Sequence, residues 1–147
     1  MNLPMPRQNR WRFARWAGVN IDRGTFIGRN VTFDSMYPEK IRCGKNVHIA
    51  DGCVFLTHYL DTSRDGIHFV TGNIELGDNV FVSTNTIISK PVRIGDNVII
   101  GAGSIVTKDI PANVVAVGNP CRILREIGEK DREFYFKDRR IDWDTMK

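Results

Sequence analysis

Residues 76–112 read LGDNVFVSTNTIISKPVRIGDNVIIGAGSIVTKDIPA, and in this stretch a hydrophobic residue recurs at every sixth position. The series consists of Leu76, Val82, Ile88, Ile94, Ile100, Val106 and Ala112. A second series, of small or β-branched residues, follows its members by four positions: Val80, Thr86, Val92, Val98, Ser104 and Ile110. An α-helix needs a hydrophobic spacing near 3.6 and a strand a spacing of 2, so neither alone explains this period. A period of six predicts a parallel β-helix, in which each hexad forms a short strand and a corner and three hexads complete a triangular coil.

The same repeat extends toward the N-terminus and is interrupted twice. It begins at Ile21, breaks at 34–40, resumes, and breaks again at 59–73. Loops that interrupt a solenoid project from one face, so we expect the long polar segment 59–73 to protrude and help build a site. The expected division is an N-terminal cap over 1–20, a β-helix domain over 21–126 and a C-terminal helical arm over 127–147.

The N-terminal segment is basic and aromatic, with no acidic residue before Asp22. Its arginines and aromatic residues alternate: Arg7, Arg10, Trp11, Arg12, Phe13, Arg15 and Trp16. A short amphipathic helix here would cover the open end of the solenoid, because terminal repeats need a cap. The alternative is contact with an anionic membrane surface or a lipid-linked sugar. We favour the cap, because short basic helices are weak anchors, and we expect no membrane association.

Composition narrows the class of protein. With 41% hydrophobic and 26% charged residues among 147, the chain resembles a soluble globular domain. It has no apolar run of roughly 20 residues and no apolar core of a signal peptide, so we expect a cytoplasmic protein. The net charge of +4 suits an anionic ligand, but no nucleic-acid-binding motif accompanies it, so we expect no nucleic acid partner. The three cysteines suggest neither a disulfide framework nor a zinc site, and Cys43 and Cys53 fall on inward positions.

The repeats resemble a known family once the downstream sequence is read with them. Gly101–Ile127, GAGSIVTKDIPANVVAVGNPCRILREI, and the tail FYFKD at 134–138 are similar to hexapeptide-repeat acetyltransferases, especially galactoside and maltose O-acetyltransferases. This resemblance implies a left-handed β-helix, a homotrimer with active sites between subunits, and acetyl-CoA as acyl donor without a metal. It implies an acceptor hydroxyl on a sugar, such as a polysaccharide precursor.

The resemblance also implies a catalytic histidine at the base of the protruding segment, and His58 occupies that position. An alcohol attacks a thioester poorly, and a neutral imidazole can take its proton as it attacks. By resemblance, a backbone N–H near Ser83 and Thr84 would stabilise the oxyanion. We expect His48 to be a solvated histidine on the outer surface, and His68 to contact the acceptor.

For acetyl-CoA, the resemblance points to six residues: Phe81, Ala102, Thr107, Lys108, Arg122 and Arg125. An aromatic residue at position 81 would pack near the pantetheine arm. A small residue at 102 would let that arm approach the backbone. The lysine and the two arginines would face the phosphates, since guanidinium groups bind phosphate in bidentate fashion.

On the acceptor side the sequence departs from the family pattern. About twenty residues precede the first repeat, where galactoside and maltose enzymes have a larger helical segment, and VTFDSMYPEKI at 31–41 replaces a family region that contains an asparagine. Galactoside specificity is therefore not implied. The candidate acceptor contacts are Asp34, Tyr37, Glu39, Tyr59 and His68. We also expect that Asp34 can orient His58 across the cleft between subunits.

Three other functions fit parts of the same pattern. One is N-acetylation of a nucleotide-linked amino sugar, which would need less help from a base. Another is a zinc carbonic anhydrase on a similar β-helix, suggested by the even spacing of His48, His58 and His68; the histidine pair five residues apart that those enzymes use is missing. The third is a non-catalytic β-helix that serves as an assembly scaffold.

Overall fold

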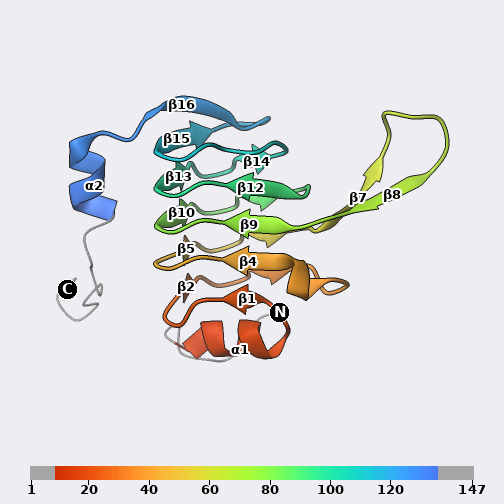
Figure 1. Cartoon of the computed structure of the whole chain (residues 1–147), viewed down its shortest axis with the longest axis horizontal. Helices are drawn as coiled ribbons and strands as arrows, with labels where there is room; N and C mark the ends of the chain where they lie inside the picture. The colour runs from red at the N-terminus through yellow and green to blue at the C-terminus, as the bar shows by residue number, and fades with distance from the viewer. Residues whose placement is uncertain (1–8, 136–147) are drawn as a thin grey trace.

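The chain forms a parallel β-helix with three flat faces, and the computed structural model describes residues 9–135 of it (Figure 1). Three parallel sheets make up these faces. Sheet A contains β1 (Asn20–Ile21), β4 (Ile41–Cys43), β9 (Ile74–Leu76) and β12 (Val92–Ile94). Sheet B contains β2 (Phe26–Ile27), β5 (His48–Ile49), β10 (Val80–Val82), β13 (Val98–Ile100), β15 (Val114–Val117) and the antiparallel β16 (Arg122–Glu126). Sheet C contains β3 (Thr32–Phe33), β6 (Val54–Phe55), β11 (Ile87–Ile88) and β14 (Ile105–Val106).

The register of the sheets confirms the period of six. Val80 pairs with Val98, Ile87 with Ile105 and Ile74 with Val92, so each coil advances by three hexads. Both series of the repeat point inward and are buried, with the exception of Ala112. Since each coil is too thin to bury its own inner face, the stacking of coils produces the continuous core. Cys43 and Cys53 are also buried in this core, and burial raises the pKa of Cys43 to about 12.

The last coil departs from the predicted phase. Ile94 bridges to Ile110 and Ile99 pairs with Val115, so this coil is two residues shorter than those before it. Ile110 therefore takes the core position that follows Val106, and the prediction that Ala112 points inward is wrong. Ala112 is an exposed corner residue that lies against Gly95 of the coil below.

The corners between sheets A and B show why asparagine recurs there. Asn46, Asn79, Asn97 and Asn113 adopt positive φ values between 52° and 62°, a conformation that asparagine tolerates better than most residues. Their side-chain amides also form a ladder, in which each Nδ2 donates to the Oδ1 of the next asparagine at 2.9–3.0 Å. The Gly77 corner has a different requirement, because a Cβ there would lie 2.9 Å from the backbone N of Asp96.

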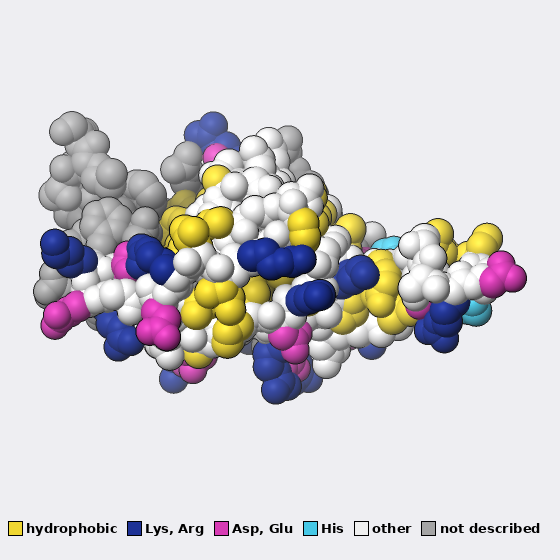
Figure 2. Space-filling model, turned by 90° about the horizontal axis from the view of Figure 1, so that it is seen from above, with side chains coloured by type: hydrophobic (Ala, Val, Ile, Leu, Met, Phe, Trp, Pro, Cys, Tyr) yellow, Lys and Arg dark blue, Asp and Glu magenta, His cyan; other side chains and the backbone are white. Residues whose placement is uncertain are grey.

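The segment 59–73 is an ordered hairpin that projects from the solenoid (Figures 1 and 2). Its strands β7 (His58–Asp61) and β8 (His68–Thr71) pair in antiparallel register. Figure 2, seen from the end that carries β16, shows the hairpin extending well beyond the body of the molecule. Exposed apolar side chains lie along it: Leu60, Ile67 and Phe69. The segment protrudes as expected, but its exposed surface includes these three apolar side chains and is not uniformly polar.

Short helical elements lie at the two ends and at one corner. Helix α1 (Arg10–Trp16) covers the open end of the first coil, where Ala14 is buried and Trp11 packs against the core. The 3-10 helix η2 (Pro38–Lys40) lies between β3 and β4, and α2 (Glu129–Tyr135) follows β16. Residues 1–8 of the predicted cap and 136–147 of the predicted arm, including the end of FYFKD, lie outside the described residues. Within residues 9–135, no helix is long and apolar enough to cross a bilayer.

Candidate active site

The corner between sheets C and A brings together residues from four successive coils. Asp34 follows β3, and its N–H donates to the carbonyl of Phe55 at 2.9 Å. Leu56 in turn donates to Ile88 at 2.9 Å, and Ser89 donates to Val106 at 3.2 Å. The residue that ends each sheet C strand is therefore stacked on its counterpart in the next coil. At this corner the chain leaves the solenoid to form the hairpin, and His58 is the first residue of β7.

A hydrogen bond joins Asp34 to His58 across two coils. The Nδ1–H of His58 donates to Oδ2 of Asp34 at 2.6 Å. The same oxygen accepts from the N–H and the hydroxyl of Thr57 at 2.9 and 2.8 Å, and Oδ1 accepts from the N–H of Met36 at 2.9 Å. The Asp34 side chain is only 2% exposed. Four donors thus hold one buried carboxylate in a single orientation.

These bonds determine the ionisation of Asp34. Burial by itself would raise the pKa of this carboxyl, because it penalises the charged form. The hydrogen bonds from the Met36 N–H, from both Thr57 donors and from His58 outweigh burial and lower the pKa of Asp34 to about 2. Asp34 is therefore a carboxylate throughout the neutral range.

The contact with Asp34 also determines the tautomer of His58. The ionised carboxylate can only accept a hydrogen bond, so Nδ1 of the neutral imidazole carries the hydrogen and Nε2 carries the lone pair. The His58 side chain is 29% exposed, which makes the ring accessible from outside the solenoid. A base with a fixed tautomer and an accessible nitrogen is the arrangement that proton abstraction from an alcohol requires.

Two aromatic residues and a lysine surround this pair. The Tyr37 ring meets the His58 ring edge-on, with centroids 6.5 Å apart. Lys90 lies over the Tyr59 ring, with Nζ 4.7 Å from its centroid. Neither Lys90 nor Thr57 was predicted as a site residue. The alignment of the hexads could have identified Lys90. Ile88 pairs with Phe55, which places Ser89 and Lys90 beside the end of β6, where the hairpin begins.

The predicted acceptor residues divide into two groups. Tyr37 and Tyr59 lie near His58, whereas Glu39 is exposed on η2. His68 pairs with Asp61, three residues along β7 from His58, which is roughly 10 Å at the usual rise per strand residue. Its Nε2 lies 2.8 Å from the carbonyl oxygen of Asp65 near the hairpin tip.

Asp34 requires one correction to its predicted role. It contacts His58 within one chain, so orientation across a subunit cleft is wrong. Its carboxylate is buried and accepts bonds from protein donors at both oxygens, which leaves it little surface for direct contact with an acceptor.

The predicted oxyanion donors lie at a different corner. The Ser83 N–H donates to the carbonyl of Ile100 at 3.0 Å, so it is part of the ladder between coils and is not available to an oxyanion. Thr84 is exposed at the corner between sheets B and C, and its carbonyl accepts from Gly103 at 2.9 Å. This contact stacks Thr84 against the turn that contains Ala102. Thr84 and Ala102 therefore lie together, separated from His58 by the width of sheet C.

The predicted acetyl-CoA residues are distributed over four places. Thr107 and Lys108 follow β14 at the His58 corner, next to Ser89. Phe81 lies on the outer face of β10, and Ala102 on the corner described above. Arg122 and Arg125 are exposed on β16. The Arg125 guanidinium forms a bidentate pair with Asp131, and this hydrogen bond lowers the pKa of Asp131 to about 2. Arg125 is thus partnered within this chain, whereas Nη1 of Arg122 donates to the neighbouring Cys121 carbonyl.

His48 differs from its prediction. It points outward from β5, but its ring stacks between Phe26 and Phe81, with centroids 5.7 and 5.9 Å away, so it is not a solvated histidine. Burial lowers the pKa of His48. His48, His58 and His68 therefore lie in three separate surroundings, and the part of the chain that the structure describes holds no group of three His, Cys, Asp or Glu residues close enough to share a metal ion.

Comparisons with known proteins agree with this arrangement. The family model described as bacterial transferase hexapeptide (six repeats) matches residues 73–108. Galactoside O-acetyltransferase of Escherichia coli (strain K12) is 39% identical over 136 residues, which cover 88% of this chain and 64% of that protein. The crystal structure of a maltose O-acetyltransferase from Clostridium difficile 630 is 32% identical, with a TM-score of 0.66 over 86% of this chain and 79% of that one. A galactoside acetyltransferase in complex with coenzyme A is also 32% identical, with a TM-score of 0.63 over 92% and 78% of the two chains.

The relative and the two solved structures align with 86–92% of this chain, and the family model covers the repeats from residue 73 to residue 108. The chain spans slightly less than two thirds of the length of the Escherichia coli relative, at 64%. The three parallel sheets and their register are those of the left-handed parallel β-helix that the resemblance implied. On its repeats, its fold and its identity to these relatives, the chain belongs to the hexapeptide-repeat acetyltransferase family.

Proposed function

We propose that this chain transfers an acetyl group from acetyl-CoA to a hydroxyl of a sugar or polysaccharide precursor, with His58 as general base. The observation that carries the proposal is the buried carboxylate of Asp34, which holds Nδ1 of His58 at 2.6 Å. Family membership supports acetyl transfer, and the galactoside and maltose relatives support a sugar hydroxyl as acceptor. We place the reaction in the cytoplasm, where acetyl-CoA is available.

The proposed reaction needs one proton carrier. Nε2 of neutral His58 accepts the hydroxyl proton while the oxygen attacks the thioester carbonyl and forms the C–O bond. Asp34 stabilises the imidazolium that results, because its charge lies against Nδ1–H. When the tetrahedral intermediate collapses, the C–S bond breaks and the coenzyme A thiolate takes the proton from Nε2. Base assistance of this kind contributes roughly 10²–10⁴ in rate.

Basic residues near His58 fit a phosphate-bearing substrate. Lys90 and Lys108 follow successive sheet C strands at the His58 corner. The side chain of Lys108 is exposed, and Lys90 lies over the Tyr59 ring. Further along the solenoid, Arg122 is exposed on β16. We infer that these three cations contact the phosphates of acetyl-CoA, as the sequence predicted for Lys108 and Arg122.

The separation of the site residues supports a homotrimer. Thr84 and Ala102 lie on the opposite edge of sheet C from His58, so one chain cannot place them around one acetyl group. A neighbouring copy that packs against sheet C would bring its own corner between sheets B and C, with Thr84 and Ala102, to His58. The outward residues agree with such packing, since sheet C presents half-buried Val54, Ile87 and Ile105. Sheet A presents Arg42, Glu75 and Arg93 instead.

The experiment that tests this function is acceptor-dependent release of coenzyme A thiol. Purified protein and acetyl-CoA would be mixed with a panel of neutral sugars, amino sugars and nucleotide sugars, and the products identified by mass and NMR. We expect release with at least one hydroxyl acceptor and an O-acetyl ester as product. Formation of an amide alone would move the activity to an N-acetyltransferase. If no thiol were released and calorimetry detected no binding of coenzyme A, the chain would be a non-catalytic β-helix scaffold and not an acetyltransferase.

A further inference from the structure

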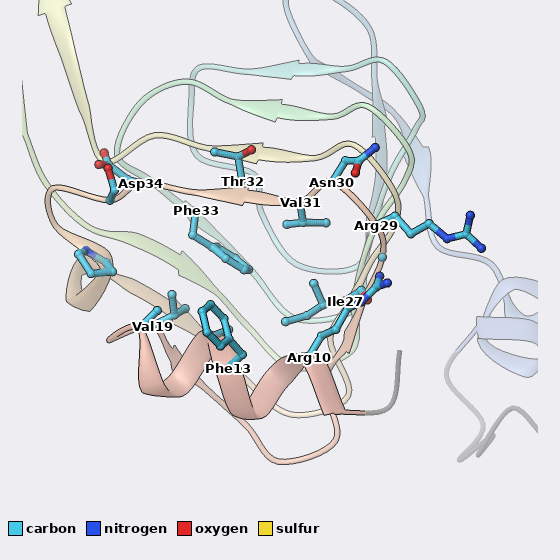
Figure 3. Close-up of a pocket in the computed structure, with 15 residues that line it drawn as sticks. Arg10, Phe13, Val19, Ile27, Arg29, Asn30, Val31, Thr32, Phe33 and Asp34 are labelled. Atoms are coloured by element: carbon cyan, nitrogen blue, oxygen red, sulfur yellow. The ribbon is translucent and has the colours of Figure 1, made fainter. Parts of the chain in front are cut away.

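A groove of about 640 Å³ lies between helix α1 and the first coil of the solenoid (Figure 3), at the end of the solenoid opposite β16 (Figure 1). Apolar side chains from the helix and the coil line much of it: Phe13, Ala14, Val19, Ile27, Val31 and Phe33. Helix α1 therefore covers the open coil without filling it. The volume lies within the range of roughly 300–1,000 Å³ that is usual for small-molecule sites.

The two ends of the groove differ in charge. Figure 3 shows Arg10 at one end, with Arg29 extending outward beyond it, and Asp34 at the opposite end. The Arg10 guanidinium makes a long contact of 3.4 Å with the carbonyl of Ile27, which keeps it beside the groove. The Asp34 carboxylate accepts bonds from Thr57, His58 and Met36 and does not offer its charge to the groove. Among the described residues, the lining thus combines apolar side chains with cationic groups at one mouth of the groove.

This combination selects a class of ligand. An apolar channel binds methylene groups by removing them from water, with a gain of about fourfold in affinity for each one buried. Guanidinium groups bind carboxylate and phosphate through charge-assisted hydrogen bonds. A free sugar fits poorly, because its hydroxyls would lose water against Phe13, Ile27 and Phe33.

We propose that this groove binds one molecule of an amphipathic anion that carries a single long alkyl chain. The chain lies between α1 and the first coil, and a terminal carboxylate or phosphate lies at Arg10 and Arg29. The groove ends at Asp34, whose carboxylate is turned to His58, but neither this proposal nor the proposed acetyl transfer depends on the other.

Isothermal titration calorimetry tests the proposal on the full chain. Dodecanoate and dodecyl phosphate, below their micelle concentrations, represent the two kinds of anionic end. We expect one molecule to bind per chain, and octanoate to bind at least tenfold more weakly because it buries four fewer methylenes. Dodecyltrimethylammonium, which has the same chain length but a cationic end, should bind more weakly than dodecanoate.

Two variants test where the ligand lies. Replacement of Arg10 and Arg29 by glutamine should weaken dodecanoate binding about threefold or more, because two partly exposed ion pairs are lost. The matched control replaces Arg12 and Arg15, exposed residues of the same helix outside the groove lining, and should leave affinity unchanged. Ala17→Trp should block the groove without disturbing the core, because Ala17 lines the groove yet is exposed.

Several results would overturn the proposal. They are an absence of dodecanoate binding, equal binding of the cationic analogue, or unchanged binding by the Ala17→Trp variant with wild-type circular dichroism. Association with phosphatidylglycerol vesicles but not with monomeric dodecanoate would also contradict it, since it would indicate a membrane surface contact. Equal loss of affinity in the Arg12 and Arg15 control would show that general charge, not the groove, attracts the anion.

Discussion

At the scale of single residues, Asp34 organises the candidate site. Its carboxylate accepts from the Met36 N–H, from the N–H and hydroxyl of Thr57, and from Nδ1–H of His58. One buried side chain therefore fixes the start of the hairpin and the tautomer of the proposed base together. A change at this residue should affect both catalysis and stability, and the two effects can be measured separately.

Asp34→Asn should lower kcat at least tenfold with a smaller change in KM. The asparagine amide puts an NH₂ group in place of one carboxylate oxygen, so this group faces one of the protein donors that Asp34 accepts from. The imidazolium of His58 also loses the negative charge that stabilises it. Steady-state kinetics across pH 6–9 measure this effect. A variant with the kcat and pH profile of the wild type would show that Asp34 is only structural.

The lowered pKa of Asp34 predicts a pH dependence of stability. Because the pKa falls from 3.8 to about 2 on folding, the carboxylate stabilises the fold above pH 4, and this contribution is lost as the pH falls toward 2. The loss should be about 2 kcal/mol in the free energy of unfolding. Urea unfolding between pH 2 and 5, with Asp34→Asn as the control that lacks this titration, measures it. Parallel pH curves for the two proteins would contradict the assignment.

His58 and Asp34 differ in how far the sequence could predict them. His58 lies directly before the break in the repeat, so the position of the base was visible once the family resemblance was recognised. The sequence suggests Asp34 as its partner but does not show that both belong to one chain, because the break at 34–40 leaves the alignment of Asp34 against the next coil open. The pairing of Phe33 with Phe55 settles that alignment and places the two residues in one chain.

At the scale of elements, the corners hold the coils in register. The period of six predicted the sheets and nearly all core positions, because inward residues must repeat wherever coils stack. It could not predict the shorter last coil, since a deletion of two residues in a corner leaves a hydrophobic residue available at Ile110. The period of six also gave no pairing for β7 and β8. These strands pair with each other outside the solenoid, so their side chains do not follow the inward positions of the repeat.

The asparagine ladder gives a prediction at this scale. Asn97→Ala should destabilise the fold by about 1–3 kcal/mol, because alanine is strained at a φ of 55° and two amide hydrogen bonds are lost. Asn97→Gly should cost roughly 1 kcal/mol less, since glycine accepts this φ and only the bonds disappear. Chemical unfolding of both variants separates the two causes. Equal loss in both would show that the backbone conformation contributes nothing.

At the scale of the whole molecule, the three faces differ in character. Sheet A carries charged residues outward, including the Arg93–Glu75 pair at 3.0 Å. Sheet C carries half-buried aliphatic residues, and sheet B carries the stack of Phe26, His48 and Phe81. Two apolar faces on a triangular solenoid are what each subunit of a three-fold assembly needs, because each subunit contacts two neighbours.

Light scattering after size exclusion should therefore report about three times the chain mass of 16.7 kDa. Ile87→Glu, which places a charge on the outer face of sheet C, should reduce the assembly to monomers that retain β-sheet circular dichroism. The matched control Arg42→Glu changes the outer face of sheet A and should leave the mass unchanged. A wild-type protein that elutes as a monomer at micromolar concentration would contradict the trimer.

The most direct test of the central claim compares two histidine variants in the thiol-release assay with a productive acceptor. His58→Ala should lose roughly 10²–10⁴ in kcat, because it removes the base that takes the hydroxyl proton. His68→Ala is the comparison variant: His68 is an exposed hairpin residue away from the Asp34 contact, and as an expected acceptor contact its loss should change KM more than kcat. If His58→Ala instead turned over at the wild-type rate, the Asp34–His58 pair would not be the catalytic base of this protein.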